Sequence, residues 1–240
     1  GPRTATAAAA AAVAVAGRKR ICLRRAPRAP RALLGHLRSE LALLGLELRR
    51  FLRACARPHR PGLRVNGLKA APGLAARLRD LGWALEPSPW CSDGLLAKES
   101  LADSLSARVP SRGRSDGASL GLSRPHLTGE VYGQELTSML PVEALKAAVA
   151  LAEPLARNLR VLDLCAAPGS KSTQLAAWLG GAGVLVANEP DPERLQVLRA
   201  NLIRAGASDC LLTGLDGRIV GGLAPGAFDA VLVDAPCSAE

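Results

Sequence analysis

Four short apolar runs in the last third of the chain constrain its fold more than any other feature of the sequence. They are separated by segments typical of helices, residues 171–179 and 192–205. Strands that are apolar on both faces and alternate with helices indicate a parallel sheet covered by helices on both sides. We therefore predict a doubly wound, Rossmann-like α/β fold, with its ligand at the carboxyl ends of the strands. The apolar runs are residues 160–165, 184–187, 210–213 and 230–233.

The turn between the first run and its helix has the composition of a ligand-binding loop. Its small residues let a ligand approach the backbone, and the helix that follows presents free N–H groups. It is not a phosphate loop, because Ser170 separates the glycine and the lysine, and it lacks the GxGxxG pattern of nicotinamide-dinucleotide domains. An ordinary strand-to-helix turn is the alternative. This predicted ligand loop consists of Cys165, Ala166, Ala167, Pro168, Gly169, Ser170 and Lys171.

An acidic residue follows each of the other three apolar runs. Glu189 comes two residues after the second run, following Asn188, where an acid in this kind of fold accepts hydrogen bonds from both ribose hydroxyls of an adenosine-containing ligand. Asp216 follows the third run and could read an adenine amino group, and Asp234 follows the fourth. A single acid after a strand is usually a turn residue. The three together favour a nucleoside-binding site.

Cys237 lies just beyond the fourth run, in the segment Asp234-Ala-Pro-Cys237. A thiolate at this edge of the sheet could add to carbon 6 of a cytosine and so make carbon 5 nucleophilic. Taken alone, the residue therefore suggests a covalent nucleophile. The alternative is a small buried hydrophobic side chain, which is the commoner role of a single cysteine.

The net charge of +10 is concentrated in the first part of the chain. Residues 1–39 and 49–79 each hold nine Lys or Arg and no acid, whereas residues 126–240 hold eight bases and thirteen acids. Clustered cations suit a polyanion backbone, so we expect a nucleic-acid partner. An arginine-rich surface exposed only to solvent is the alternative.

The pattern along the chain suggests four parts. Residues 1–39 form an Ala/Arg-rich leader, which is either low-complexity sequence or an organelle transit peptide. Residues 40–97 form a small basic α+β domain, with a helix from Ser39 to the prolines at 58 and 61, strands at 63–66 and 83–85, and a helix at 75–81. Residues 98–125, rich in Ser, Arg and Gly, form a loop or insertion, and residues 126–240 form the doubly wound domain.

Two classes of protein are disfavoured by composition. No apolar run reaches the roughly 18 residues of a membrane span. The six cysteines are scattered, without CxxC spacing, so we expect neither a metal site nor a disulfide framework.

The motifs together resemble the Sun-type RNA (cytosine-5) methyltransferases, and in particular the bacterial RsmF (YebU) subgroup, which modifies small-subunit ribosomal RNA. The resemblance covers about residues 51–97 and 126–240. Among the segments that carry it are VLDLCAAPGSKSTQLA, VANEPDPERLQVLRANLIRAGASD, FDAVLVDAPCSAE and HLTGEVYGQELTSMLPVEAL.

This resemblance implies a class I methyltransferase fold and S-adenosyl-L-methionine as the cofactor. The ligand loop would wrap its methionine and ribose parts. Glu189 would hold the ribose hydroxyls, Asp216 the adenine, and Asp234 the region near the methyl donor. The resemblance also changes the interpretation of Cys237: in this family the cysteine after Asp-Ala-Pro assists resolution of the covalent intermediate, and the attacking thiolate lies on a later Thr-Cys segment.

By the same resemblance the substrate is RNA, with ribosomal RNA first and transfer RNA still open, and basic residues including Arg64 and Lys69 would position it. We expect a monomer that is cytoplasmic, or organellar if the leader is a transit peptide. We also expect the chain to be a C-terminally incomplete piece of a longer enzyme, inactive by itself. A catalytically inactive RNA-binding paralogue on the same fold is the alternative.

Overall fold

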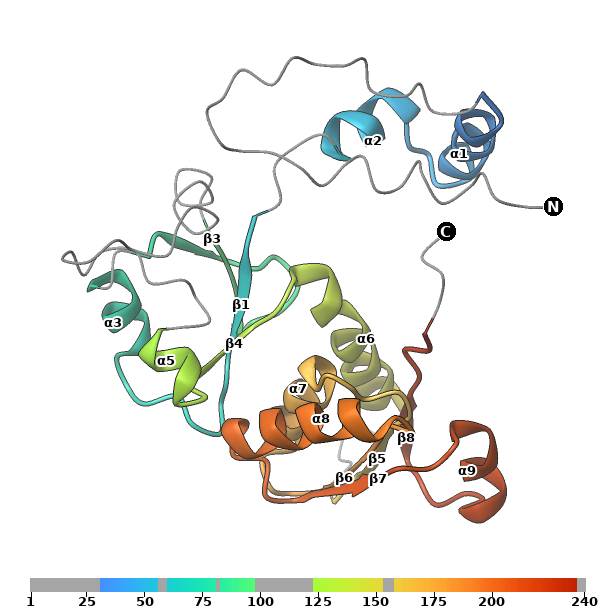
Figure 1. Cartoon of the computed structure of the whole chain (residues 1–240). Helices are drawn as coiled ribbons and strands as arrows, with labels where there is room; N and C mark the ends of the chain where they lie inside the picture. The colour runs from blue at the N-terminus through green and yellow to red at the C-terminus, as the bar shows by residue number, and fades with distance from the viewer. Residues whose placement is uncertain (1–30, 56–59, 81–82, 98–122, 153–157, 237–240) are drawn as a thin grey trace. The chain divides into compact units, whose positions relative to one another are not determined.

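The computed structural model describes residues 31–55, 60–80, 83–97, 123–152 and 158–236. These residues divide into two compact units, with the division falling between residues 55 and 60. Each unit is described by itself below, with the labels of Figure 1.

The first unit contains two helices, α1 (Arg31–Leu43) and α2 (Leu48–Cys55), so the prediction of one helix beginning at Ser39 is wrong. The Ser39 hydroxyl donates a hydrogen bond to the Gly35 carbonyl inside α1, at 3.2 Å. The chain leaves α1 at Gly45, which has a φ of 66°. Leu46 N–H donates to the Leu41 carbonyl at 2.8 Å, as in a Schellman motif, in which glycine adopts the left-handed conformation and ends the helix.

The second unit begins with a small antiparallel sheet in the order β2-β3-β1-β4. Helix α3 (Leu74–Asp80) packs on it, and its Leu78 is fully buried with Leu63 and Val131 from the sheet. The predicted strand at 63–66 and helix at 75–81 are confirmed within the described residues, whereas the strand expected at 83–85 begins only at Leu85. The four strands are β1 (Gly62–Val65), β2 (Leu85–Pro87), β3 (Gly94–Ala97) and β4 (Val131–Gly133).

Strand β4 comes from beyond the predicted loop or insertion, most of which lies outside the described residues. It pairs with β1 through Arg64 and Tyr132, and short helix α5 (Arg124–Leu127) precedes it. The small sheet is therefore completed by a segment that the sequence pattern assigns to the following domain.

The rest of the second unit is built on a parallel sheet in the order β7-β6-β5-β8, which confirms the predicted Rossmann-like α/β fold. Strand β5, the first strand of this sheet along the chain, lies between β6 and β8, so the strand order reverses at β5. In such sheets the ligand binds at the carboxyl ends of the strands on either side of this reversal. The strands are β5 (Arg160–Asp163), β6 (Val184–Asn188), β7 (Cys210–Thr213) and β8 (Ala230–Leu232).

Three helices pack on one face of the parallel sheet (Figure 1). Val142 of α6, Leu175 of α7 and Leu198 of α8 are fully buried in the two clusters on this face, the first two against Val161 and Leu185. The predicted helices are confirmed as α7 (Ser170–Leu179) and α8 (Pro192–Ala205), whereas α6 (Leu136–Ala152) and α9 (Gly217–Leu223) were not predicted.

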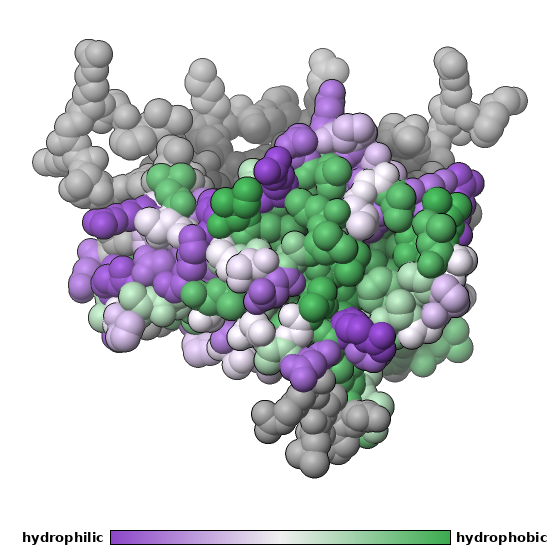
Figure 2. All heavy atoms as spheres, turned by 90° about the horizontal axis from the view of Figure 1, so that it is seen from below, coloured by the Kyte–Doolittle hydropathy of each residue, from purple (hydrophilic) through white to green (hydrophobic). Residues whose placement is uncertain are grey.

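The opposite face of the parallel sheet is more exposed. Val231, Leu162, Val186 and Leu211 are paired in register across the four strands, and Val231 and Leu211 are 46% and 58% exposed. Hydrophobic side chains gather across the middle and right of Figure 2, which views the molecule from below. Among the described residues no helix combines the length and the hydrophobicity needed to cross a membrane.

Candidate functional site

The ligand loop leaves the sheet at Asp163 and enters α7 at Ser170. Its turn depends on Gly169, whose φ of 106° is unfavourable for residues with a side chain. A Cβ atom at Gly169 would lie 3.1 Å from the Leu198 side chain and 3.4 Å from that of Asn201. Gly169 also leaves the N-terminus of α7 without a side-chain cap. The first turn of α7 therefore offers N–H groups to an acceptor from a ligand.

Three hydrogen bonds, one to β6 and two from α8, fix the ligand loop. Ala166 N–H donates to the Asn188 carbonyl of β6 at 2.9 Å. From α8, the Arg194 guanidinium donates to the Ala167 carbonyl at 3.0 Å, and the Asn201 amide donates to the Pro168 carbonyl at 2.7 Å. The loop is held in one conformation before any ligand arrives, which lowers the entropic cost of binding.

Asp163 supplies a buried acid beneath the loop. It is 1% exposed, and its Oδ2 accepts a hydrogen bond from the Ser172 hydroxyl at 2.7 Å. Burial raises the pKa of Asp163, and the bond from Ser172 opposes that rise. Within the part of the chain that the structure describes, Oδ1 is buried and has no hydrogen-bond partner. A buried acceptor without a partner is costly, so a ligand that donates a hydrogen bond here would stabilise the site.

Asn188 at the end of β6 holds the neighbouring strand ends together. Its side-chain amide donates to the carbonyls of Leu164 and Leu215, at 3.1 and 2.9 Å. Its side-chain oxygen accepts from the Thr213 hydroxyl and from Leu215 N–H, at 2.8 and 2.9 Å. The amide thus ties the ligand loop to the segment after β7.

Glu189 lies next to Asn188 and is 2% exposed. Its Oε1 accepts from Asp191 N–H at 3.1 Å, and its Oε2 lies 3.4 Å from the Arg194 guanidinium. Since Arg194 also contacts the Ala167 carbonyl, it joins Glu189 to the ligand loop. The structure therefore brings these two parts of the predicted site together. Arg194 itself was not predicted, because an arginine in the first turn of a helix carries no signal in a single sequence.

Lys171, in the first turn of α7, forms an ion pair with Asp234, which follows β8. The Lys171 ammonium lies 2.6 Å from an Asp234 carboxylate oxygen, with the lysine side chain 14% exposed and that of the aspartate 56% exposed. Cys165 belongs to the same ligand loop: burial raises the pKa of its thiol, and the carboxylates of Asp163, Glu189 and Asp234 raise it further. The raised pKa favours the protonated thiol at neutral pH.

Asp216 follows β7 and begins α9 as its N-cap. Its carboxylate accepts from Arg218 N–H at 3.0 Å and pairs with the Arg218 guanidinium at 2.5 Å, and these bonds lower the pKa of Asp216 to about 2. In the free protein the carboxylate is therefore already engaged. Cys237 lies outside the described residues.

The remaining observations concern the predicted RNA contacts, metal ligands and cavities. Arg64 is 1% exposed, so the prediction that it contacts RNA is wrong: its guanidinium is enclosed by protein groups. Lys69 is exposed. Among the described residues, no group of three or more potential metal ligands is found. A cavity of about 170 Å³ lies at the far end of α7, beside Gly180, Gly206 and Asp209, away from the ligand loop.

A parallel sheet of this order, with a glycine-dependent loop after its first strand and a buried acid after its second, defines a Rossmann-like methyltransferase core. A family model described as 16S rRNA methyltransferase RsmB/F matches residues 149–240, and one described as the N-terminal domain of 16S rRNA methyltransferase RsmF matches residues 36–136. The chain belongs to this methyltransferase family.

Individual proteins agree with this assignment. The ribosomal RNA small subunit methyltransferase F of Klebsiella pneumoniae is 42% identical over 212 residues, which is 88% of this chain and 40% of that protein. The chain thus spans less than half the length of this relative. A crystal structure of a methyltransferase homolog from Pyrococcus horikoshii matches with a TM-score of 0.63 and 28% identity, over 88% of this chain and 64% of that one. NSun6 from the same organism, solved with SFG, matches with a TM-score of 0.66 over 87% of this chain and 71% of its own, and at 18% identity it supports the fold alone.

Proposed function

We propose that the chain binds S-adenosyl-L-methionine at the ligand loop and that the protein methylates carbon 5 of cytosine in RNA, with small-subunit ribosomal RNA as the substrate. The observation that carries the proposal is the pairing of a glycine-dependent loop with buried Glu189 through Arg194. Membership in the family supports methyl transfer as the reaction. When bound, the cofactor supplies an electrophilic methyl group on its sulfonium.

The chemistry of the site suits each part of this cofactor. The ligand loop and the free N–H groups of α7 would hold the methionine carboxylate. The Glu189 carboxylate would accept hydrogen bonds from the ribose hydroxyls. The unpartnered oxygen of Asp163 could accept from the methionine ammonium. Asp234, held by Lys171, would face the region near the methyl donor, and Asp216 would read the adenine amino group after partial release from Arg218.

Exposed cations would hold the RNA. Arg49, Arg50 and Arg53 of α2 are all exposed, and Lys69 lies beside the carbonyl of Thr128, 3.4 Å away. Phosphate contacts by such side chains supply affinity without sequence information. Arg64 is excluded from this set by its burial.

The cysteine chemistry rests on the family resemblance. Cys237 would assist release of the methylated base, and the attacking thiolate of the family lies in a Thr-Cys pair. The 240 residues contain no such pair. We therefore expect cofactor binding rather than turnover from these residues alone. An inactive RNA-binding paralogue is not favoured, because the chain keeps both the loop glycine Gly169 and the buried acid Glu189 that a cofactor needs.

Calorimetric titration with S-adenosyl-L-methionine tests the proposal. The unchanged chain should bind, and Glu189→Gln should weaken binding by about tenfold or more, because a hydrogen bond from the ribose to a charged acceptor is lost. Glu193→Gln, on the exposed side of the first turn of α8, is the matched control and should bind as the unchanged chain does. Absence of binding by the unchanged chain, or equal binding by the Glu189 variant, would contradict the proposal.

A further inference from the structure

Arg64 of β1 is a charged side chain sealed inside the second unit. It is 1% exposed, although burial of a guanidinium is costly unless its donors find acceptors. Its Nε donates to the Gln134 side-chain oxygen at 2.9 Å, and one terminal nitrogen donates to the Thr173 hydroxyl oxygen at 2.8 Å. Burial lowers the pKa of Arg64 to about 10, so the group stays charged at neutral pH. Its acceptors come from two different parts of the unit, the segment after β4 and helix α7.

The contact with Thr173 leads directly into the ligand loop. Thr173 is 1% exposed and lies in the first turn of α7. Its oxygen accepts from Arg64, so its hydroxyl proton is directed to the Ser170 carbonyl, 3.0 Å away. The Thr173 N–H donates to the Gly169 carbonyl at 2.9 Å. A cation of the small sheet therefore fixes the turn whose N–H groups face the proposed cofactor.

A second path runs from the small sheet to the same loop. The Arg204 guanidinium of α8 lies 5.1 Å from the ring centroid of Tyr132, and that of Arg64 lies 5.9 Å from it. Arg204 donates to the Asn201 side-chain oxygen at 3.1 Å, and the Asn201 amide donates to the Pro168 carbonyl at 2.7 Å. The two paths start at one aromatic ring and end at the two sides of the Gly169 turn.

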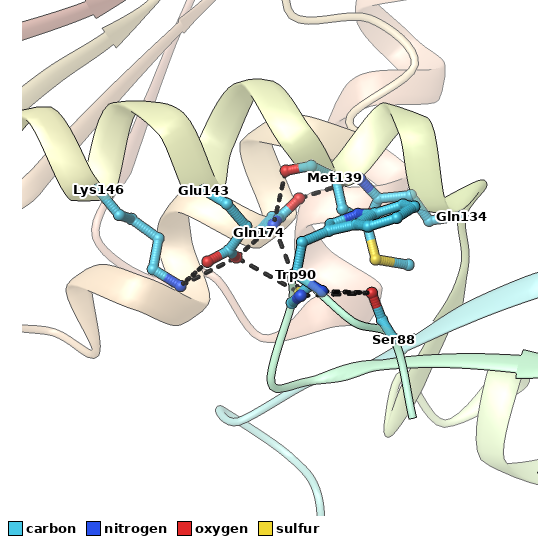
Figure 3. A network of polar contacts seen from close by, with 8 residues as sticks. Ser88, Trp90, Gln134, Met139, Glu143, Lys146 and Gln174 are labelled. Carbon is cyan, nitrogen blue, oxygen red and sulfur yellow. Dashed lines mark hydrogen bonds and ion pairs between the residues drawn. The ribbon is translucent and has the colours of Figure 1, made fainter. Parts of the chain in front are cut away.

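A third branch of the network ends elsewhere and serves as a reference. Gln134 donates to Gln174 at 3.0 Å, and Gln174 donates to Glu143 of α6 at 3.0 Å (Figure 3). Glu143 also pairs with Lys146 at 2.9 Å. This branch is as well connected as the Arg64–Thr173 branch, but it joins α6 to α7 and leads away from the Gly169 turn.

We propose that Arg64 is a positioning residue for the cofactor, acting through Thr173 on the Gly169–Ser170 turn, so that the small sheet belongs functionally to the cofactor site. The inference rests on the proposed function, because it concerns the affinity of the same site. A residue that only held the two sheets together would affect stability and leave affinity per folded molecule unchanged. A positioning residue changes the affinity itself.

Titration of S-adenosyl-L-methionine into five variants separates these roles. Thr173→Val removes the hydroxyl, breaks both of its bonds and should weaken binding by about tenfold. Thr173→Ser keeps the hydroxyl and should restore binding to within about twofold. Glu143→Gln removes the ion pair with Lys146 from the reference branch and should lower the unfolding midpoint without changing affinity. The double variant Arg64→Met/Thr173→Val should bind the cofactor about as tightly as whichever of its two single variants binds less tightly. The two losses do not add, because both substitutions break the same Arg64–Thr173 contact.

Two outcomes would overturn the inference: unchanged affinity in Thr173→Val, or equal losses of affinity in Thr173→Val and Glu143→Gln. If Arg64→Met does not fold, the affinities of Thr173→Val and its control Thr173→Ser still test the inference. The rate of amide hydrogen exchange at residues 170–173 is a second measurement, and it should rise only in Thr173→Val. Failure here is distinct from failure of the proposed function. In the latter case the unchanged chain does not bind, whereas here it binds and Glu189→Gln weakens it.

Discussion

The ammonium group of Lys171 and the carboxylate of Asp234 lie 2.6 Å apart, although 63 residues separate them in the sequence. Lys171 belongs to the first turn of α7, and Asp234 follows β8. The ion pair therefore lies at the carboxyl ends of β5 and β8, next to the point where the strand order of the parallel sheet reverses. Sites for adenosine-containing ligands in doubly wound folds lie at such points, so the pair marks the position of the proposed cofactor.

Replacement of Gly169 should remove both the turn and the binding. In Gly169→Ala the new Cβ would press on Leu198 in a backbone region that alanine avoids, at a cost of about 1–3 kcal/mol. We expect a lower free energy of unfolding and S-adenosyl-L-methionine binding weakened by about tenfold or more. Gly221→Ala is the control, because no atom of the residues that the structure describes lies within 4 Å of its would-be Cβ in α9. It should leave binding unchanged, and equal binding by both variants would contradict the role of Gly169.

The buried Asp163 predicts a particular pH dependence of stability. Burial raises its pKa in the folded state above the ordinary 3.8, so folding favours the protonated carboxyl group. The contribution of Asp163 to the free energy of unfolding is therefore fully present below pH 3.8. It is lost as the pH rises through the raised pKa of the folded state. Relative to Asp163→Asn, which stays neutral, the unchanged chain should lose stability over that range in urea titrations at successive pH values. A difference that stays constant would show that burial of Asp163 carries no such penalty.

The ion pair between Arg160 and Asp229, at the amino ends of β5 and β8, predicts the opposite change: stability that is lost as the pH falls. Arg160 donates to Asp229 through its backbone N–H at 2.8 Å and through its guanidinium at 2.9 Å, and these bonds lower the pKa of Asp229 to about 2. The stabilisation is present above the ordinary pKa of 3.8 and is lost as the pH falls through about 2. Asp229→Asn should thus be less stable than the unchanged chain at pH 7, by a margin that shrinks below pH 4.

High salt supplies the control for this pair. Both side chains are partly exposed, so about 1 M NaCl should reduce the difference at pH 7. An effect of Asp229→Asn that is independent of both pH and salt would mean that the bond to the Arg160 N–H, rather than the charge, stabilises the strand edge.

The exposed arginines of α2 should contribute to RNA affinity in a salt-dependent way. Replacing Arg49, Arg50 and Arg53 together with glutamine should weaken binding to ribosomal RNA. It should also lower the slope of log affinity against log salt by about 0.7 for each RNA phosphate that is no longer neutralised. Arg199→Gln, on the exposed side of α8, is the control. Filter binding at several salt concentrations measures both quantities. An unchanged slope in the triple variant would place the RNA surface elsewhere.

Much of the parallel sheet could be predicted because its signals are local. Apolar runs and glycine-bearing turns identified all four of its strands, and helices α7 and α8 followed from the segments between them. Helix α6 was not recognised, because Pro141 lies inside it and its apolar residues surround the whole helix instead of marking one face. Strands β3 and β4 were not recognised either, because their sequences, Gly-Leu-Leu-Ala and Val-Tyr-Gly, show no alternation of apolar and polar residues.

The site could be predicted only where single residues carry their own signal. The ligand loop and Glu189 follow from their places after strands. Arg64 was misassigned to RNA because charge in a sequence carries no information on burial, and its partners Gln134 and Thr173 lie 70 and 109 residues away. Only the folded chain shows that this cation belongs to the interior. Arg194, which joins Glu189 to the loop, was missed because its contacts with Glu189 and the Ala167 carbonyl exist only in the folded chain.

Hydrogen exchange with and without S-adenosyl-L-methionine tests the central claim most directly, because it locates the bound cofactor. We predict slower exchange of backbone amides in residues 164–173 and 188–191 when the cofactor is present, with no change at α2. Protection confined to the cavity beside Gly180 and Gly206, at the far end of α7, would contradict the account. Unchanged exchange throughout the chain at saturating cofactor would contradict it as well.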